Sequence, residues 1–419
     1  MSMPAPSRTL DDWLALLEKR HPVAIELGLE RVADVAGRLL KSERPPVITV
    51  AGTNGKGSVV ATLKTLARKH GLRAGVYTSP HILHFNERIE IDGRIASDAE
   101  LVHAFEAVEA ARAGVSLTYF EFTTLAAFWL FDQQALDLLI LEVGMGGRLD
   151  AVNIIDADVA VITTIDFDHM AFLGDTLEAI ASEKAGICRA GKPVVLADPE
   201  RRELLLSAVQ PHDAKAYAIG LDYQFTVNDG QFRFSAGAFD LRAAAPTLGA
   251  DLVAAALMAF RLLFPQQLDT DACRQAVEQA ALAGRWQQIG QNPPCWVDIG
   301  HNPQASKRLA ERAKAAGFLR WHLVVGMLAD KDIVGVLKPW FGMQPVWYLS
   351  NLSGSRAASA KQLQAALPSD AETQQFATPN EALQAAKAAA AAGEAILVFG
   401  SFLTVAAVLD QESSFNKGG

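Results

Sequence analysis

Short apolar runs recur along the first two thirds of the chain and alternate with amphipathic stretches. The runs predict strands at Val47–Ala51, Ala74–Tyr77, Leu136–Val143, Val159–Ile165 and Val194–Ala197. Strands that are apolar throughout, with helical patterns between them, are typical of a parallel sheet covered on both faces. Residues Gln224–Leu241 instead alternate with period two around Asn228-Asp229-Gly230, which predicts a hairpin. The pattern therefore indicates an α/β domain with a small antiparallel patch.

The apolar pattern restarts in the last third of the chain. It predicts further strands at Cys295–Ile299, Trp321–Gly326, Pro345–Leu349 and Ala395–Phe399, and a helix over the alanine-rich run Ala385–Ala392. Between the two patterns, Gly290-Gln-Asn-Pro-Pro294 suits neither a helix nor a central strand, because proline fixes φ and lacks a donor. We predict domains at residues 1–289 and 295–419, joined by a linker at 290–294. Two domains also suit a length of 419 residues.

Composition and charge exclude several classes of protein. The net charge is −9 and no block of Lys and Arg occurs, so we expect no nucleic-acid partner. No apolar run reaches the length of a membrane span, and Met1–Trp13 lacks the basic start and apolar stretch of a secretory signal. We therefore predict a cytoplasmic protein that does not bind membranes. The odd number of cysteines, Cys188, Cys273 and Cys295, predicts buried free thiols.

The clearest chemical motif follows the strand Val47–Ala51. It comprises Gly52, Thr53, Asn54, Gly55, Lys56, Gly57 and Ser58, and a helix with Val59, Leu63 and Leu66 on one face follows. Glycines let successive N–H groups face a phosphate, the helix N-terminus adds partial positive charge, and Lys56 adds a full one. The spacing departs from the common phosphate-loop expression, since Val50 replaces its first glycine and Gly57 separates Lys56 from Ser58. We interpret it as a variant phosphate loop rather than a glycine-rich turn.

Three candidate metal ligands follow other predicted strands. Glu142 ends one apolar strand, and Ser79 and His169 come shortly after two more. Carboxyl ends of parallel strands meet at one edge of a sheet, where ligands commonly bind. Each residue also has a simpler explanation: Glu142 in a salt bridge with Arg148, His169 as an ordinary loop histidine, and Ser79 as a turn residue before proline.

Six motifs together resemble the bifunctional dihydrofolate synthase/folylpolyglutamate synthases of the Mur ligase superfamily. They are Gly52-Thr-Asn-Gly-Lys-Gly-Ser58, Thr78-Ser-Pro-His81, Glu142-Val-Gly-Met-Gly-Gly-Arg148, Asp168-His169, Ser182-Glu-Lys-Ala-Gly186 and Asp298-Ile-Gly-His-Asn-Pro303. The resemblance covers nearly all of the chain. It implies a phosphate-loop ATPase domain of Mur ligase type, followed by a smaller Rossmann-like α/β domain that serves glutamate ligation.

The resemblance also implies roles for individual residues. ATP contacts are Gly52 to Ser58, with Arg285 and Asp298; magnesium ligands are Ser79, Glu142 and His169; catalytic residues are Lys56, Lys184 and His301. Two segments, Ile25–Val32 and Thr118–Thr124, resemble those that hold dihydropteroate in bifunctional members of the family. The implied pterin contacts are Glu26, Gly28, Leu29, Thr118, Tyr119, Phe120, Glu121, Leu149, Asp150 and Ala151. From the residues alone, Tyr119, Phe120 and Phe122 would be explained as core packing, and Asn302-Pro303 as an N-cap and first helical residue.

Lys184 resembles the lysine that this superfamily carbamylates. The sequence predicts a helix from Asp175 to Gly186 with Ile180 and Lys184 on one face. Magnesium would repel a cationic lysine, whereas addition of CO2 to the neutral amine yields a carboxylate that the metal favours. An ion pair of Lys184 with Glu183 or with a phosphate is the alternative.

Three positions depart from the family pattern. Glu26 stands where aspartate is usual, Leu403 stands where histidine or tyrosine is usual, and Gly249-Ala-Asp-Leu252 lacks the asparagine that contacts adenine. The adenine contact therefore has no candidate in the sequence.

The implied reaction activates a substrate carboxylate with ATP and joins it to L-glutamate, releasing ADP and phosphate. The expected ligands are MgATP, L-glutamate, dihydropteroate, and tetrahydrofolate with its polyglutamates, and we expect a monomer. The rival hypotheses are a folylpolyglutamate synthase without dihydrofolate activity, another Mur-type ligase, and a phosphate-loop switch.

Overall fold

The apolar strands of the first two thirds form one eight-stranded sheet in a computed structural model of the chain, which describes residues 8–23 and 25–416. The strand order is β4-β3-β2-β5-β1-β6-β7-β8, parallel from β2 to β8 and antiparallel at β3 and β4. The bounds are β1 Val47–Ala51, β2 Ala74–Tyr77, β3 Ile89–Ile91, β4 Arg94–Ile95, β5 Leu138–Glu142, β6 Val159–Ile162, β7 Pro193–Leu196 and β8 Lys215–Ala218. The predicted parallel α/β class is confirmed.

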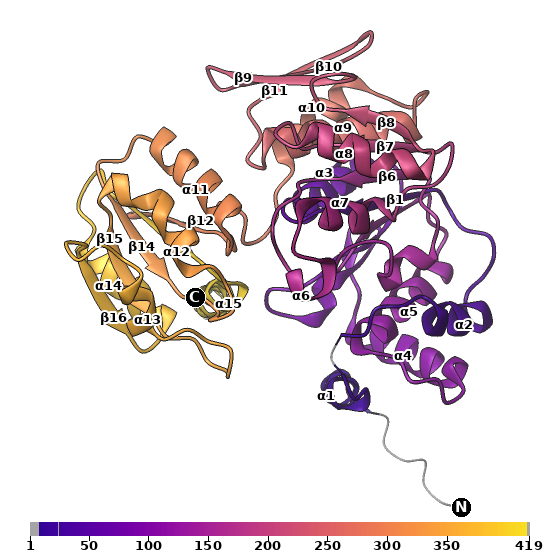
Figure 1. Cartoon of the computed structure of the whole chain (residues 1–419), viewed down its shortest axis with the longest axis horizontal. Helices are drawn as coiled ribbons and strands as arrows, with labels where there is room; N and C mark the ends of the chain where they lie inside the picture. Colours follow the sequence, from indigo (N-terminus) through magenta and orange to yellow (C-terminus); the bar gives the residue numbers. More distant parts are fainter. Residues whose placement is uncertain (1–7, 24, 417–419) are drawn as a thin grey trace, which may run out of the picture. The chain divides into compact units, whose positions relative to one another are not determined.

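Helices cover both faces of this sheet (Figure 1). One face packs against α1 Leu10–Arg20, α2 Glu30–Leu39, α4 Asp98–Arg112, α5 Tyr119–Asp132, α6 Met170–Leu173, α7 Leu177–Ala185 and α8 Arg202–Val209. The other packs against α3 Lys56–Lys69 and α9 Ala250–Leu263, and α10 Thr270–Gln279 packs on α3. Successive residues of a strand point to opposite faces, so Val47 and Ile48 are both fully buried, on different sides. Short 3₁₀ turns are η1 Phe85–Arg88, η2 Ala151–Ile154 and η3 Gln210–His212.

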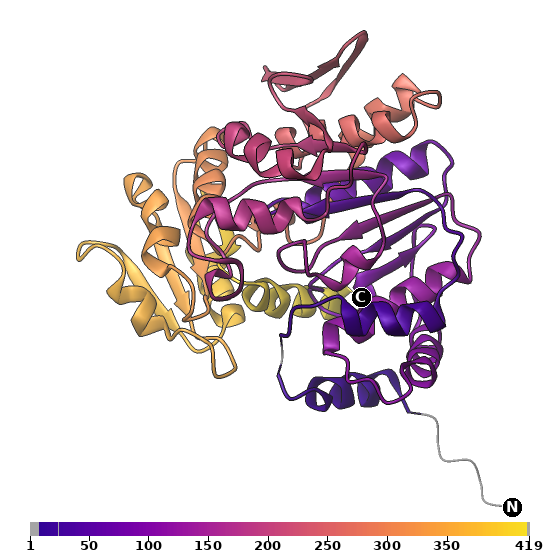
Figure 2. The ribbon, with the colours of Figure 1, turned by 45° about the vertical axis from the view of Figure 1, so that its right-hand side comes forward.

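The predicted hairpin around Asn228-Asp229-Gly230 is confirmed and gains a third strand. β9 Gln224–Asn228, β10 Gln231–Ala236 and β11 Phe239–Ala244 form a separate antiparallel sheet that projects from the first unit in both views (Figures 1 and 2). Asp229 and Gly230 both have positive φ, as this tight turn requires.

The second unit, Leu282–Gly419, has its own six-stranded sheet in the order β12-β13-β17-β14-β15-β16. Its strands are β12 Gln287–Gln291, β13 Pro294–Val297, β14 Trp321–Val325, β15 Val346–Ser350, β16 Thr373–Phe376 and β17 Ala395–Phe399. Its helices are α11 Pro303–Ala315, α12 Ile333–Leu337, α13 Ala360–Ala365, α14 Pro379–Ala389 and α15 Phe402–Asn416, with a 3₁₀ turn η4 Lys338–Met343. All neighbours are parallel except β12 and β13.

The linker predicted at 290–294 is wrong. The first unit ends at Ala281, and residues 290–294 form the turn between β12 and β13, which pair as an antiparallel hairpin within the second unit. Two prolines close this turn at the sheet edge, where a missing ladder donor is tolerated. The outer limits of the predicted domains, at Met1 and Gly419, lie outside the described residues.

Smaller corrections concern element ends. Helix α7 begins at Leu177 rather than at the predicted Asp175, because Thr176 provides the N-cap and accepts from the Ala179 N–H at 3.1 Å. The expected buried free thiols are confirmed at all three cysteines. Within residues 8–23 and 25–416, no helix has both the length and the apolar character needed to cross a membrane.

Candidate functional site

The loop between β1 and α3 presents an open helix N-terminus. Gly55 occupies the N-cap with φ of 90°, so no side chain caps the first turn of α3, which starts at Lys56. The first N–H groups of a helix have no partner within the helix and carry partial positive charge. This loop can therefore receive an anion, as predicted for residues 52–58.

Tight packing holds the loop in this shape. A Cβ on Gly52 would lie 1.7 Å from the Thr163 Oγ1, and one on Gly55 would lie 2.6 Å from the Leu252 Cδ1. The Thr53 N–H donates to the Thr164 carbonyl at 2.7 Å, and the Thr163 hydroxyl donates to the Asn54 carbonyl at 2.6 Å. The segment after β6 therefore holds the loop in place through hydrogen bonds. At positions 52 and 55, glycine is the only residue that fits without rearrangement of Thr163 or Leu252.

Two lysines face one pocket beside this loop. The Lys56 Nζ donates to the Gly52 carbonyl at 2.9 Å, while Lys184 comes from α7 and is 4% exposed. The pocket is lined by Gly52, Thr53, Lys56, Val143, Gly144, Met145, Gly146, Asp168, His169, Leu173 and Lys184. Burial, and then the charge of Lys56, lower the pKa of Lys184 to about 7. A large share of Lys184 is therefore a neutral amine near neutral pH.

The loop after β5 forms the opposite wall of the pocket. Asp150 organises it: one carboxylate oxygen accepts from the Met145 N–H and the other from the Val152 N–H, both at 2.9 Å. Burial raises the pKa of Asp150 to about 6, against the lowering effect of these hydrogen bonds. Leu149 is half-buried and Ala151 is buried in η2. If a pterin contacts the Asp150 carboxylate, it must share the carboxylate oxygens with the Met145 and Val152 N–H groups.

The three predicted metal ligands follow the parallel strands β5, β2 and β6, whose carboxyl ends lie at the same edge of the sheet. Glu142 ends β5 and is 6% exposed, Ser79 follows β2, and His169 follows β6 and lines the pocket. Among the described residues, no three His, Cys, Asp or Glu side chains form a ready metal cage. Mg2+ usually takes one or two carboxylates together with water and substrate phosphates. A buried carboxylate beside a phosphate loop is therefore a donor set that fits Mg2+.

Two of the simpler explanations are now replaced. The Arg148 guanidinium pairs with Glu183, at 2.7 Å from Nη2 to Oε1, and the Arg148 side chain is 54% exposed while that of Glu183 is 20% exposed. Arg148 therefore has another partner than Glu142, and Glu183 has another partner than Lys184. Gly147 lets this loop approach α7 closely, since a Cβ there would lie 2.8 Å from the Glu183 carbonyl.

The segment from Thr118 to Glu121 starts helix α5. Thr118 is its N-cap and Glu121 completes a capping box, in which the Glu121 carboxylate accepts from the Thr118 N–H at 2.8 Å. Tyr119 and Phe120 are half-buried, and the Phe120 ring lies against Gly144 in the pocket wall. Phe122 is fully buried in the core, as the packing explanation predicts.

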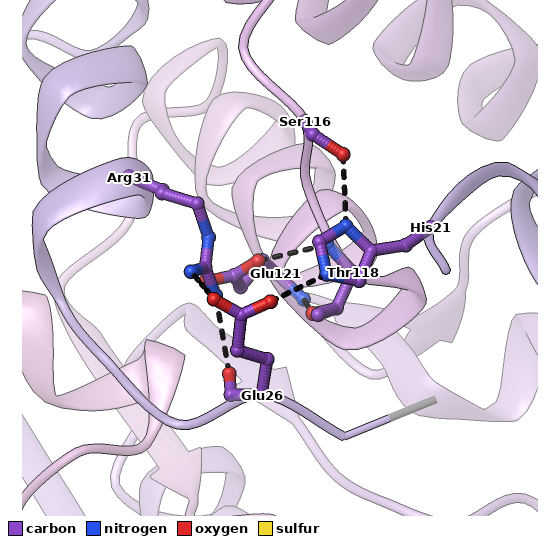
Figure 3. A network of polar contacts seen from close by, with 6 residues as sticks. All are labelled: His21, Glu26, Arg31, Ser116, Thr118 and Glu121. Atoms are coloured by element: carbon purple, nitrogen blue, oxygen red, sulfur yellow. Dashed lines mark hydrogen bonds and ion pairs between the residues drawn. The ribbon is translucent and has the colours of Figure 1, made fainter. Parts of the chain in front are cut away.

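The first predicted pterin segment lies beside Thr118 and Glu121. The side chain of Glu26 is 43% exposed, Gly28 and Leu29 are half-buried, and Leu29 precedes α2. Arg31 joins Glu26 to Glu121, and His21 contacts Glu26 from the other side (Figure 3). The structure thus brings together two segments that are far apart in the sequence.

The second unit gathers its predicted residues at the carboxyl end of β13. Both oxygens of the Asp298 carboxylate accept backbone N–H groups at 2.8 Å, one from Trp286 and one from Gly300. Asp298 is 7% exposed, and burial raises its pKa although the charge of Arg285 opposes the rise. The Arg285 guanidinium and the His301 ring both lie near Phe402, at 5.9 and 6.0 Å.

The structure also places three further positions for which the sequence gave an expectation or a departure from the family pattern. Asn302 is the N-cap of α11 and Pro303 its first residue, as predicted. Leu403, next to Phe402, is 46% exposed. Asp251 lies in the first turn of α9, next to the Leu252 that contacts Gly55, and the adenine contact stays unassigned.

Sequence reasoning missed several residues of these sites. Asp168 lines the pocket, although the sequence singles it out only as part of a motif, and Thr163 and Thr164 support the phosphate loop. The available signal was their position near a strand end: Thr163 and Thr164 lie in the last three residues of the predicted strand Val159–Ile165, and Asp168 follows it. His21 gave no signal, and Arg31 gave none beyond its place in the segment Ile25–Val32, because Ser116 and Glu121, which they also contact, lie 95 and 90 residues away.

A phosphate loop on a parallel sheet, followed by a smaller α/β unit with its own strand-end site, defines a Mur-type ligase. Family comparison agrees: the Mur ligase middle domain matches residues 50–260, and the Mur ligase glutamate ligase domain matches residues 284–402. The chain belongs to the dihydrofolate synthase/folylpolyglutamate synthase family, and it is an ATP-dependent, ADP-forming ligase.

Individual relatives support this placement. The dihydrofolate synthase/folylpolyglutamate synthase of Escherichia coli K12 is 40% identical over 99% of this chain and 98% of its own length, and that of Haemophilus influenzae is 38% identical over 95% and 96%. The structure of E. coli FolC with DHPP and ADP matches with a TM-score of 0.93 at 40% identity, covering 99% of this chain and all of that one. A Yersinia pestis structure with Mn, AMPPNP and L-glutamate bound gives 0.90 at 41% identity, covering 98% of this chain and 99% of that one.

Proposed function

We propose that the chain joins L-glutamate both to dihydropteroate, forming dihydrofolate, and to tetrahydrofolate and its polyglutamates. The observation that carries the proposal is the pocket in which the phosphate loop, Lys56, Lys184 and His169 meet. The relatives named above support the substrates: their names state both activities, and the related structures hold ADP, AMPPNP, Mn and L-glutamate.

The first step transfers the γ-phosphoryl group of ATP to the carboxylate of the folate substrate. The N–H groups at the start of α3 hold the phosphates, and Lys56 exchanges its bond with the Gly52 carbonyl for one with the transferred group. Ser79, Glu142 and His169 would hold Mg2+, which neutralises charge on the phosphates when bound. The protein thus contributes positioning and electrostatic stabilisation.

The second step is attack of the glutamate amine on the acyl phosphate, which forms the amide and releases phosphate. We assign glutamate ligation to the second unit, where Arg285, Asp298 and His301 gather at one strand end. Asp298 acts here mainly by holding Trp286 and Gly300, which fixes the backbone next to Arg285 and His301. The family resemblance also implies that Arg285 and Asp298 contact the nucleotide; at Asp298 such a contact would share the carboxylate with the two N–H groups that it already accepts.

Lys184 is proposed to react with CO2 and become a carbamate. The reaction needs a neutral amine, and burial beside Lys56 lowers the pKa of Lys184 to about 7. The product is an anion in a pocket that also holds Lys56, which reverses an unfavourable pair of like charges. Lys184→Ala should abolish glutamate-dependent ADP formation, and short carboxylic acids should restore part of it. Failure of every such acid to restore activity would contradict the carbamate.

A single assay tests the substrate proposal. The protein is incubated with MgATP and L-glutamate, plus dihydropteroate or tetrahydrofolate, and ADP release and product mass are followed. Both pteridines should gain one glutamate, with ADP release dependent on glutamate. A mass gain with tetrahydrofolate alone would identify a folylpolyglutamate synthase without dihydrofolate activity, and no gain with either would refute the proposal.

We also propose a cytoplasmic monomer, to be checked by fractionation and by light scattering.

A further inference from the structure

Arg31 connects the two segments to which we assign the pteridine. Its guanidinium pairs through NH1 with the Glu26 Oε1, and its NH2 donates to the Glu26 carbonyl at 3.2 Å. The same NH2 donates to the Glu121 Oε1 at 3.0 Å. Glu26 belongs to the segment 25–29 and Glu121 to the segment 118–121, so one side chain spans both (Figure 3).

His21 holds Glu26 from the opposite side. It follows α1, and its Nε2 lies 2.7 Å from the Glu26 Oε2 while its Nδ1 lies 2.8 Å from the Ser116 Oγ. A neutral imidazole satisfies both contacts when Nε2–H donates to the carboxylate and the serine hydroxyl donates to Nδ1. The contacts with His21 and Arg31 lower the pKa of Glu26, the His21 hydrogen bond most of all. Glu26 is therefore held as an anion.

The carboxylates of Glu26 and Glu121 are thus occupied by the protein. Glu26 receives His21 on one oxygen and Arg31 on the other, while Glu121 receives the Thr118 N–H and Arg31. The side chain of Glu121 is 4% exposed, and a buried carboxylate without its cation is strongly unfavourable. These residues are consequently better suited to fixing the two segments than to reaching for a ligand.

We propose that His21 and Arg31 are positioning residues which, with Glu26 and Glu121, form a clasp that sets the distance between segments 25–29 and 118–121 and thereby the affinity for the pteridine substrate. The inference rests on the proposed function, with the pteridine placed against these two segments as the family resemblance implies. The phosphate loop is built from other elements, so the clasp acts on the pteridine and leaves ATP binding unchanged.

The test uses Glu26→Gln and Arg31→Met in the full chain. Steady-state ADP formation is measured against dihydropteroate and, separately, against MgATP, at saturating L-glutamate. Small displacements of substrate-positioning groups can cost up to about a hundredfold in rate, so we expect KM for dihydropteroate to rise about tenfold or more. KM for MgATP should stay at the wild-type value. Glu26→Asp and Arg31→Lys, which keep the charges, should recover part of the loss.

The matched control lies on the same helix. Asp34→Asn removes the exposed pair between Asp34 and Arg38 on α2, 2.9 Å apart, which touches neither segment. It should leave both KM values unchanged. Glu26 is partly exposed, so Glu26→Gln remains a fair test even if Arg31→Met folds poorly.

The outcomes distinguish a failure of the clasp from a failure of the proposed function. A wild-type chain that makes no dihydrofolate would overturn the proposed function, and the clasp with it. An active wild type whose Glu26→Gln and Arg31→Met variants keep the KM for dihydropteroate would overturn the clasp alone. The clasp is also overturned if the variants lose only kcat and thermal stability, because that result marks a purely structural role.

Discussion

Two strand–loop–helix elements, one in each unit, differ in how the N-terminus of the helix is capped. In the first unit β1 leads through Gly55 into α3, and in the second β13 leads through Asn302 into α11. Asn302 caps its own helix, accepting from the Ala305 N–H at 2.9 Å, whereas Gly55 has no side chain to do so. The cap of α11 occupies one of the N–H groups at the start of that helix, whereas no side chain of the N-cap residue occupies those of α3, which stay available for a phosphate.

The two loops also hold their shape differently. Absent side chains shape the first, because Gly52 and Gly55 lie where any Cβ would collide. A buried carboxylate shapes the second, because Asp298 binds two backbone N–H groups, one of them on Trp286, whose φ is 41°. A side chain added at Gly52 or Gly55 should therefore displace the first loop. In the second loop, each hydrogen bond that Asp298 loses should lower the free energy of unfolding by a limited amount.

The largest effect is expected from Gly52→Ala. The added Cβ would need the space of the Thr163 Oγ1, which is fully buried, so the loop must move away from its phosphate-binding shape. We expect kcat/KM for MgATP to fall about a hundredfold, measured by ADP release. Gly37→Ala on α2 is the control, since a Cβ there meets nothing within 4 Å. Near-normal activity of Gly52→Ala would show that the loop is softer than its steric contacts imply.

The next effect is a pH dependence that arises in the pocket beside the first loop. Lys184 has a pKa lowered to about 7, whereas Arg312, beside Asp298, has a pKa lowered by burial to about 10 and stays charged at neutral pH. Carbamylation needs the neutral lysine, so activity should rise about tenfold between about pH 6 and about pH 8 at fixed dissolved CO2. A profile that is flat over this range would contradict the role of Lys184.

The same residue predicts how stability changes with pH. The native pKa of Lys184 lies below its ordinary value of 10.5, so between about 7 and 10.5 the unfolded chain binds more protons than the native one. The free energy of unfolding in CO2-free buffer should therefore rise with pH across this window. Urea titrations of the wild type and Lys184→Met check it, and the rise should flatten in the variant.

A smaller effect is expected from Asp298→Asn in the second loop. Asparagine has one acceptor oxygen, so the N–H of either Trp286 or Gly300 loses its partner in a buried place. The expected loss is about 1–3 kcal/mol of unfolding free energy, measured by urea denaturation. Unchanged or higher stability would mean that the cost of burying the charge outweighs the two hydrogen bonds.

The smallest effect is expected at the cap of the second helix. Asn302→Ala should cost about 1 kcal/mol and Asn302→Gly only a few tenths, because glycine leaves the helix end open to solvent. Thermal denaturation of both variants measures the difference. If both cost the same, the cap of α11 is not what distinguishes it from α3.

Much of the fold and of the phosphate loop could be predicted because the information is local. Val47–Ala51, Ala74–Tyr77 and Ala395–Phe399 have the predicted bounds, since a fully buried strand must be apolar along its whole length. The edge strands β8 and β16 were missed, because Lys215–Ala218 and Thr373–Phe376 are partly exposed and carry polar residues. Their neighbours, not their composition, make them strands.

Local patterns in the sequence thus determined most of the buried parallel strands, the position of the phosphate loop, and Asn302 as the start of a helix. It could not settle where the units divide, since the prolines at 293 and 294 suit a hairpin turn as well as a linker. Nor could it foresee the pKa of Lys184 or the link from Arg31 to Glu26 and Glu121. Burial and electrostatic coupling belong to atoms that meet only after folding, and distance along the chain says nothing about them.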